Sequence, residues 1–206
     1  YSSQMVIDML KRQGIEKMNP IEALQKCKSD GYKRVVIQSS NILDGVMTDL
    51  IEKDAREMKG QFDTIMIGKP LLWNVEDCRW IADLLVSHIA APKGTEVILV
   101  GHGTVGPADA MYTMLDYVLH DKGYNNYHVA TIEGYPNLDN AIKNIKNEPA
   151  RKVILYPLLM IAGNHVTKDI SGRWKHSLEN LGYQVEVRNE GLAGLPEVQN
   201  RIIPQI

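Results

Sequence analysis

The chain has 206 residues, of which 44% are hydrophobic and 23% are charged, and its formal net charge at pH 7 is −2. A chain of this length and composition can bury a sizeable core, as one large domain or as two small ones. The lack of a long basic run argues against general nucleic-acid binding, and no apolar stretch approaches the ~20 residues of a membrane span.

The first predicted element is a helix at 3–13, in the pattern "SSQMVIDMLKRQG". An α/β domain more often begins with a strand, so we expect an amino-terminal piece to precede Tyr1. The carboxyl end, "RIIPQI", also looks shortened. The chain shows no signal-peptide pattern. We therefore expect a cytoplasmic protein, and a periplasmic location stays open while the amino terminus is unseen.

Helical and strand patterns alternate along the rest of the chain. Further helices are predicted at 20–30, 46–59, 74–90, 107–121, 137–147 and 171–181. Strands are predicted at 34–39, 63–68, 96–101, 127–133, 152–159 and 183–188. Glycines that follow four of these helices support the helix ends. This alternation predicts βαβ crossovers and a parallel sheet with helices on both faces.

Most cysteine and histidine residues favour structural roles. Cys27 and Cys78 each lie on the apolar stripe of a predicted helix, which predicts two core thiols rather than a metal cluster. Four of the six histidines lie late in a helix, inside a helix or at the start of a strand, and we expect them to be structural: His88, His120, His128 and His176.

A fifth histidine stands in a different setting, within "VILVGHGTVG" at 97–106. The β-branched run before it is typical of a buried strand. Gly101 and Gly103 leave no side chains beside the ring of His102. We interpret that clearance as room for a bulky ligand to approach the imidazole, although a strand-to-helix turn with an incidental histidine would give the same pattern.

A regular spacing links this histidine to two other ligand-type residues. Thirty-one residues separate His102 from Glu133, and thirty-two separate Glu133 from His165. One βαβ unit has about thirty residues. The three side chains therefore occupy matching places near the carboxyl ends of three strands, the edge at which open α/β sheets bind ligands. Two imidazoles and a carboxylate form a ligand set suited to Co, Fe, Ni or Zn.

Counting back from His102 by the same interval reaches Pro70, and a second step reaches Ser39 and Ser40. None of these residues is a strong metal ligand. We expect the two serines to contact a substrate rather than a metal.

The segments around these residues resemble one family of enzymes. "GHGT", "IEGYPNLD" and "YPLLMIAGNHVTKDI" are similar to the anaerobic cobalt chelatases of cobalamin biosynthesis, the sirohydrochlorin cobaltochelatases. "PIEALQKCKSDGYKRVVIQS" and "GKPLL" also match, so that the resemblance covers nearly the whole chain. It implies an α/β fold of two similar doubly wound parallel-sheet domains with a cleft between them. The expected division is 1–72, which lacks its first strand, and 73–206, which carries the metal ligands.

The resemblance also implies a reaction, the insertion of a divalent metal into a tetrapyrrole without a nucleotide cofactor. Co(II) is the expected metal, with Ni(II), Fe(II) or Zn(II) as alternatives. The family's ligands fall on His102, Glu133 and His165. We expect His102 to accept a pyrrole proton as well, and Glu133 to help carry protons away. Because the substrate carries many carboxylates, cationic side chains should line the cleft. The candidates are Lys69, Lys168 and Arg173, and a solvated surface charge is the alternative for each of them.

The chain departs from the family's pattern in several places. The strand and "GT"-type loop that usually precede the first helix are absent from this sequence. In "SNILDGVMTD", Asn41 stands where a histidine is common, and Val46 and Met47 stand where acidic residues are common. Gly106 replaces a second histidine after "HGT". These positions surround the expected cleft, so they bear on substrate handling and metal choice.

Two other classes of function stay open. A carrier that holds a tetrapyrrole, haem or metal without turnover would use the same pocket, and the changes at Asn41 and Gly106 favour it. A plain α/β binding domain with an accidental trio would bind no metal there. A hydrolase that uses His102 is disfavoured, because no G-x-S-x-G elbow lies beside it. Self-association as a homo-oligomer also stays open.

Overall fold

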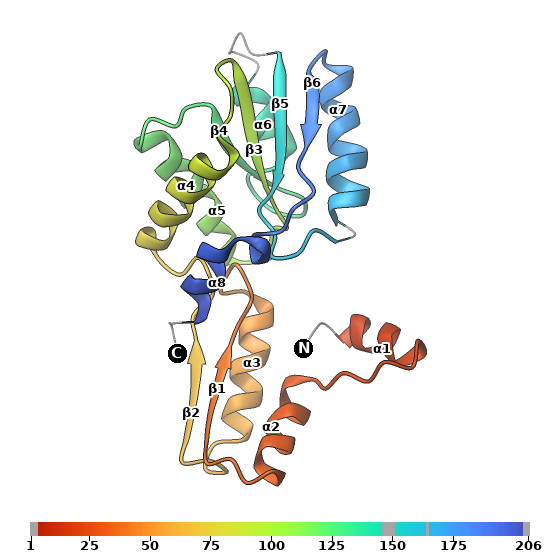
Figure 1. The fold of residues 1–206 in the computed structure, drawn as a ribbon, viewed down its shortest axis with the longest axis vertical. Coiled ribbons are helices and arrows are strands. Elements are labelled where there is room, and N and C mark those ends of the chain that lie inside the picture. The colour runs from red at the N-terminus through yellow and green to blue at the C-terminus, as the bar shows by residue number, and fades with distance from the viewer. Residues whose placement is uncertain (1–3, 146–150, 164, 204–206) are drawn as a thin grey trace.

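The computed structural model describes residues 4–145, 151–163 and 165–203, and two parts follow each other along its long axis (Figure 1). The amino-terminal part holds a parallel pair of strands with helices beside it. Its elements are α1 (Gln4–Arg12), α2 (Pro20–Ser29), β1 (Arg34–Gln38), α3 (Val46–Glu57) and β2 (Thr64–Gly68).

The carboxyl-terminal part is built on a four-stranded parallel sheet of order β4-β3-β5-β6. Its strands are β3 (Thr95–Gly101), β4 (Tyr127–Thr131), β5 (Lys152–Pro157) and β6 (Gln184–Val187). Its helices are α4 (Val75–Ile89), α5 (Ala110–Asp121), α6 (Leu138–Ile145), α7 (Lys175–Asn180) and α8 (Pro196–Ile202). Short helical segments precede α5 and α7 and follow β6: η1 (Pro107–Asp109), η2 (Val166–Trp174) and η3 (Leu192–Gly194). The predicted α/β class with parallel strands is confirmed.

Strand β3 explains why the four-stranded sheet carries helices on both faces. Its side chains alternate between two hydrophobic clusters, as the period of two in a strand requires. Val97 and Leu99 pack into the cluster that α4, α5 and α8 complete. Ile98 and Val100 pack into the other, which α6 and α7 complete. A strand that is buried on both faces needs a continuous apolar run, and this is the pattern that the sequence shows.

Among the residues that the structure describes, a hydrophobic core covers one face of the sheet of the amino-terminal part. Val35, Ile37 and Ile65 pack with α2 and α3 around a small core. On the other face, Val36 and Met66 are 41% and 50% exposed. In the four-stranded sheet, β4 and β5 lie on either side of β3, whereas β1 and β2 pair directly with each other.

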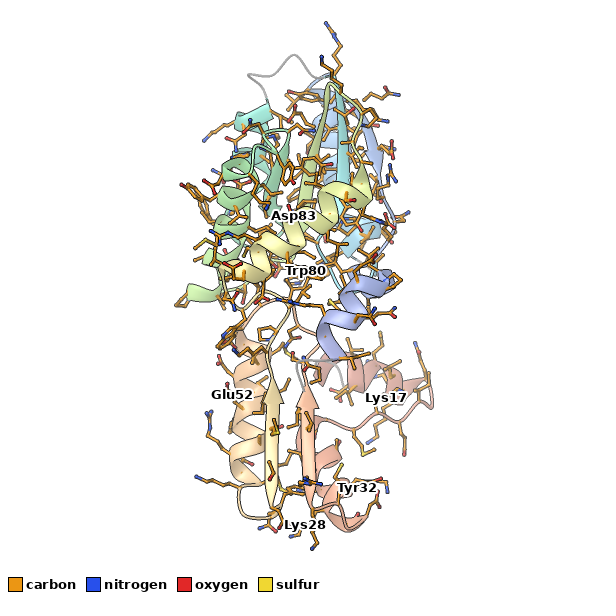
Figure 2. The ribbon with its side chains drawn as sticks, turned by 60° about the vertical axis from the view of Figure 1, so that its left-hand side comes forward. Lys17, Lys28, Tyr32, Glu52, Trp80 and Asp83 are labelled. Carbon is orange, nitrogen blue, oxygen red and sulfur yellow. The ribbon has the colours of Figure 1, made fainter. Side chains whose placement is uncertain are left out.

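The two parts meet at the loops that follow β1 and β2. Leu43, Leu71 and Leu72 from these loops are buried in the core cluster that contains α4. Helix α8 closes the junction, because Arg201 donates to the Asp77 carboxylate at 2.7 Å and lies 5.3 Å from the ring of Trp80. Figure 2 shows Trp80 on α4 close to this junction. The carboxyl ends of β1 and β2 are thereby held against the carboxyl-terminal part.

Most predicted elements are present, with shifted ends, and the differences that bear on the site are at β4, η2 and α8. Strand β4 ends at Thr131, so Glu133 lies in the loop after it. The helix expected from residue 171 begins at Val166 with π-helical geometry. Helix α8 was not predicted. The end of the helix predicted at 137–147 lies partly outside the described residues. Among the residues that the structure describes, no helix is long and apolar enough to cross a membrane.

Both thiols have the environment that the sequence predicts. Cys78 is fully buried among the residues of the larger core cluster, and burial raises the pKa of its thiol to about 12. Cys27 packs against the core of the amino-terminal part. A thiol that stays protonated at neutral pH is a poor nucleophile and a poor metal ligand. We therefore leave Cys78 out of the functional site, and we leave Cys27 out because its neighbours are the apolar side chains of that small core.

Candidate metal centre

His102 stands at the carboxyl end of β3, and the glycines beside it serve the packing of the chain. A Cβ on Gly101 would lie 2.3 Å from the ring of Tyr112 on α5. A Cβ on Gly103 would lie 2.5 Å from the backbone nitrogen of Gly134, and the φ of Gly103 is +87°. The interpretation of these glycines as clearance for a ligand was wrong, because protein atoms fill the space beside both of them.

The loops after β3 and β4 are joined by one carboxylate and one backbone contact. Asp109 accepts from the backbone nitrogen of Thr104 at 3.0 Å and from that of Tyr135 at 2.5 Å. The backbone nitrogen of Glu133 donates to the carbonyl oxygen of His102 at 2.9 Å. The interval of 31 residues between His102 and Glu133 therefore corresponds to two loops that lie against each other at one edge of the sheet.

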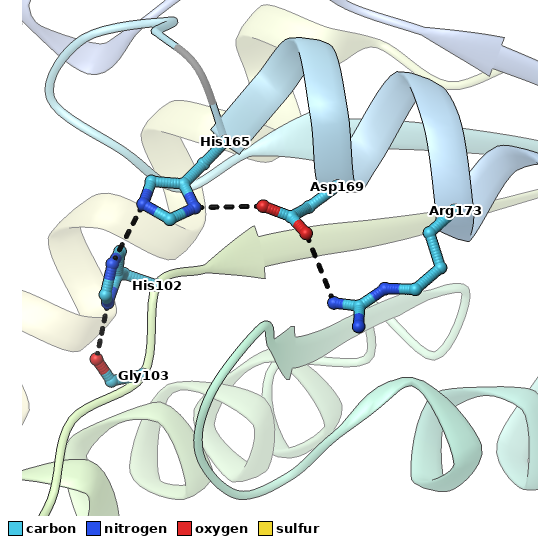
Figure 3. Close-up of polar contacts among 5 residues, drawn as sticks. All are labelled: His102, Gly103, His165, Asp169 and Arg173. Atoms are coloured by element: carbon cyan, nitrogen blue, oxygen red, sulfur yellow. Dashed lines mark hydrogen bonds and ion pairs between the residues drawn. The ribbon is translucent and has the colours of Figure 1, made fainter.

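The imidazoles of His102 and His165 face each other across this edge (Figure 3). Their Nε2 atoms are 3.1 Å apart, and their ring centroids are 4.5 Å apart. The sequence spacing predicted that these two residues would meet. They come from different strand ends, since His102 follows β3 and His165 immediately precedes the helical segment η2 after β5.

Hydrogen bonds at the opposite ring nitrogens set the tautomer of each imidazole. The Nδ1 of His102 lies 2.9 Å from the carbonyl oxygen of Gly103, which can only accept. The Nδ1 of His165 lies 3.0 Å from a carboxylate oxygen of Asp169, and Arg173 donates to the other oxygen of that carboxylate at 3.3 Å. In the tautomer that both acceptors favour, each ring carries its proton on Nδ1 and keeps a lone pair on Nε2. The 3.1 Å contact between the two Nε2 atoms is a hydrogen bond when one of them also carries a proton.

Two lone pairs directed at one point form half of a metal site. Imidazole nitrogens bind divalent transition metals at about 2.0–2.1 Å. Two nitrogens 3.1 Å apart then subtend an angle of roughly 100° at a shared ion, which suits adjacent positions in tetrahedral or octahedral coordination. The carboxylate behind His165 is the partner that metal-binding histidines usually have.

Glu133 lies at the same edge, but its carboxylate does not complete the pair in this conformation. Its side chain is exposed, and it does not form a group of three ligand atoms within 4.8 Å with the two imidazoles. Its place in the loop beside His102 is fixed through the backbone. Its role as a ligand therefore stays a prediction.

The predicted substrate-binding residues occupy different environments. Ser39 is buried, and its hydroxyl oxygen accepts from the backbone nitrogen of Asn41 at 3.0 Å, so it stabilises the loop after β1. Ser40 is exposed in the same loop. Lys69 is exposed, with its Nζ 5.3 Å from the ring of Trp73. Lys168 and Arg173 are exposed on η2, which begins beside His165. Arg173 is also paired with the carboxylate of Asp169.

A cavity of about 450 Å³ lies between the two parts, next to the loop that carries His102. Three exposed apolar side chains, Val46, Trp73 and Val105, contribute to its lining, as does the carboxylate of Asp49. A larger cavity of about 620 Å³ lies between α3 and β2, and its lining residues all belong to 52–67. The smaller cavity is the one that a substrate of the histidine pair could occupy, because the loop after His102 lines it.

Two supporting residues, Asp109 and Asp169, were missed by the sequence analysis. Asp169 lies four residues after His165, a spacing that places both side chains on one side of a helical turn. It was overlooked because the helix was predicted to begin at residue 171. Asp109 joins two loops that are distant in sequence, and no local pattern marks such a residue.

Replacing Asp169 with asparagine is expected to weaken Co²⁺ binding at the histidine pair by about 10–100-fold, because the amide removes the charge behind His165. Titration of Co²⁺ by calorimetry measures this change. Glu179→Gln is a matched control, since Glu179 is an exposed carboxylate that pairs with Lys175 on α7. Equal affinities for the two variants would show that Asp169 does not support the metal.

Comparisons with known proteins show the family of this chain. The family model described as cobalt chelatase (CbiK) matches residues 1–206. The sirohydrochlorin cobaltochelatase of Salmonella typhimurium is 28% identical over 212 aligned positions, which cover 100% of this chain and 80% of that protein. The sirohydrochlorin cobaltochelatase CbiKC of Nitratidesulfovibrio vulgaris is 30% identical over 170 positions, which cover 79% of this chain and 60% of that protein.

Two solved structures share the fold. SirB from Bacillus subtilis with Fe³⁺ has a TM-score of 0.68 and 16% identity, and the match covers 92% of this chain and 77% of that one. The sirohydrochlorin chelatase SirB from Bacillus subtilis subspecies spizizenii in complex with cobalt has a TM-score of 0.62 and 16% identity, covering 93% and 76%. These likenesses confirm a chelatase-like fold.

Proposed function

Because this chain belongs to the cobalt chelatase family CbiK, we propose that it is an enzyme that inserts Co²⁺ into sirohydrochlorin at the carboxyl edge of its four-stranded sheet. The observation that carries the proposal is the pair of Nε2 atoms 3.1 Å apart, a separation at which both can bind one ion or share one proton. This arrangement can take a metal ion or a proton, and metal insertion requires both.

The exchange between a metal ion and protons supplies a mechanism. Sirohydrochlorin gives up two pyrrole protons when one divalent ion enters its ring, so metal and protons move in opposite directions. In the proposal, His102 and His165 hold Co²⁺ and replace part of its water shell. As the ion passes to the macrocycle, a vacated Nε2 accepts one pyrrole proton. Glu133, exposed beside His102, accepts the second and passes it to solvent.

The macrocycle is proposed to enter from the cavity between the two parts. The exposed faces of Val46, Trp73 and Val105 supply apolar contact for its ring. Its carboxylates would pair with exposed cations near the edge, Lys69 and Lys168, and the hydroxyl of Ser40 would donate to one of them. Asp44 and Asp49 also line the cavity and would repel those carboxylates, so they favour a pose with the acidic groups turned away from α3.

The proposal also includes the domain division, the compartment and the alternative metals that the sequence predicts. Residues 1–72 and 73–206 form two domains, and no nucleotide or nucleic acid takes part. The enzyme acts in the cytoplasm, and self-association stays open. Ni²⁺, Fe²⁺ and Zn²⁺ are alternative metals, because a site with two imidazoles accepts all of them.

A carrier that binds a tetrapyrrole or metal without turnover is the second candidate. It is favoured by Asn41 and Gly106, which stand where two more histidines were expected. Turnover separates the two functions. An anaerobic absorbance assay with sirohydrochlorin and Co²⁺, run with and without the protein, should show faster metal insertion with the protein. Equal rates in the two reactions would favour the carrier.

Asn41→His is expected to raise the rate of cobalt insertion, by up to about 100-fold, because an added imidazole supplies a further proton acceptor near the cavity. Asn41 is half-buried in the loop after β1, whose carboxyl end lies at the junction of the two parts. The same absorbance assay measures the change, with Asn41→Gln as the control without an imidazole. A rate that is unchanged or lower in Asn41→His, in a folded protein, would show that the asparagine does not limit the reaction.

A further inference from the structure

A second cluster of ligand-type side chains lies away from the histidine pair. Asp116, His120 and His128 each offer a nitrogen or carboxylate oxygen, and these three atoms lie within 4.8 Å of one another. Among the residues that the structure describes, this is the one group of three or more such side chains with that spacing. Asp116 and His120 lie four residues apart on α5, and His128 lies on the neighbouring strand β4.

The hydrogen bonds of both histidines leave one ring nitrogen available to a metal. The Nε2 of His128 lies 2.8 Å from a carboxylate oxygen of Glu96, and the Nε2 of His120 lies 3.1 Å from the carbonyl oxygen of Tyr127. Both partners are acceptors, so a neutral ring donates through Nε2 and keeps its lone pair on Nδ1. A carboxylate behind a ligating imidazole is a typical supporting contact in metal sites.

The Nδ1 of His128 is the observation that points to a ligand. The residue is only 3% exposed, and this nitrogen has no hydrogen-bond partner. A buried polar atom without a hydrogen-bond partner destabilises the folded protein, so it calls for an explanation. Asp116 uses one carboxylate oxygen to accept from the backbone nitrogen of Val129 at 2.7 Å. Its second oxygen is available to an ion.

The geometry points to a second metal site at Asp116, His120 and His128, which takes a divalent transition cation such as Zn²⁺ or Co²⁺. Two imidazoles and one carboxylate suit these ions, and the half-buried positions of Asp116 and His120 admit a water molecule as fourth ligand. The site lies at the amino ends of the strands. His102 follows the carboxyl end of β3, six residues after Glu96 and roughly 20 Å away at the rise of a strand.

This second site has a structural role. Asp116 and His120 already bind the outer edge of β4 through the backbone of Val129 and Tyr127. A metal ion would add a link from α5 to the side chain of His128 and would hold the helix against this edge strand. The loop of His102 leads directly into η1 and α5. A metal ion at the second site would therefore also hold the helix that begins beside this loop.

The test uses the full chain with the first site removed by His102→Ala and His165→Ala. Titration with Co²⁺, followed by its visible absorption and by equilibrium dialysis, should show one bound ion per chain. Adding Asp116→Asn should weaken this binding by more than tenfold while keeping the acceptor for Val129. Glu96→Gln should weaken it by about 10–100-fold, because it removes the charge behind His128.

His88→Asn is the matched control, since His88 pairs with the carboxylate of Glu190 at 3.2 Å but belongs to no group of three. It should leave the binding unchanged. The proposal is overturned if the double-alanine protein binds no Co²⁺ at millimolar concentration, or if Asp116→Asn and His120→Asn leave the binding unchanged. Neither readout depends on chelatase activity, so the result is independent of the proposed function.

Thermal unfolding tests the structural role and does not require replacement of a buried residue. Zn²⁺ at a hundredfold excess over its Kd should raise the Tm of the double-alanine protein by about 5–10 °C. The same Zn²⁺ concentration should leave the Tm of the Asp116→Asn derivative nearly unchanged. An equal rise in both proteins would show that the ion acts elsewhere and would contradict the assignment.

Discussion

His102→Ala is expected to lower the rate of cobalt insertion by about 10²–10⁴-fold, the range for loss of a group that transfers a proton. The variant also removes one of the two imidazoles that face each other at 3.1 Å, and so weakens metal delivery. The side chain is only half-buried, so the free energy of unfolding should change by less than about 1 kcal/mol. Initial rates of insertion and urea unfolding curves measure the two effects.

Replacement of His165 tests whether the two imidazoles act together. If the two imidazoles work as one unit, His165→Ala should cause a similar loss, and the double variant should be little worse than either single variant. His176→Ala is the control, because His176 is exposed on α7 and away from the pair. Additive losses would show that the two histidines act independently, and a variant that fails to fold would show that His102 is structural.

Gly103→Ala is expected to destabilise the protein by about 2–6 kcal/mol and to abolish insertion. The backbone of Gly103 has a φ of +87°, which costs an alanine about 1–3 kcal/mol. The new Cβ would also lie 2.5 Å from the backbone nitrogen of Gly134, so the loops of His102 and Glu133 would have to separate. Such overpacking typically costs a further 1–3 kcal/mol. Urea unfolding measures the loss of stability.

Gly106→Ala separates the effect of backbone strain from the effect of a steric clash at the new Cβ. Gly106 has a similar φ of +99°, but no atom lies within 4 Å of the position that its Cβ would take. Its replacement should therefore cost only the backbone strain, about 1–3 kcal/mol, and should leave the loops of His102 and Glu133 in contact. If both variants lose the same stability, the contact between the two loops contributes nothing, and the packing explanation for Gly103 is wrong.

The fold was largely predictable because its strongest signals are local. Apolar runs such as Val97–Val100 are buried on both faces, and their period and length identify strands without knowledge of their neighbours. The meeting of His102 and His165 was also predictable. Successive βαβ units have similar lengths, and their strands end at the same edge of a parallel sheet.

The supporting contacts of the site were not predictable, because they depend on pairs of residues from different segments. Asp109 links two loops, and no pattern in either loop marks it. The glycines next to His102 were misinterpreted for the same reason, since the atoms that fill the space beside them come from Tyr112 and Gly134. The π-helical geometry of η2 placed Asp169 behind His165, and the expected helix began too late to include it.

The most direct test of the account is the amount of product formed per chain. Sirohydrochlorin and Co²⁺ are mixed anaerobically in large excess over the protein, and cobalt insertion is followed by absorbance and corrected for the reaction without protein. A chelatase that releases its product should form many molecules of cobalt-sirohydrochlorin per chain, at a rate proportional to the protein concentration and lost in His102→Ala. Product that stops at one molecule per chain, or a rate equal to the uncatalysed one, would contradict the account.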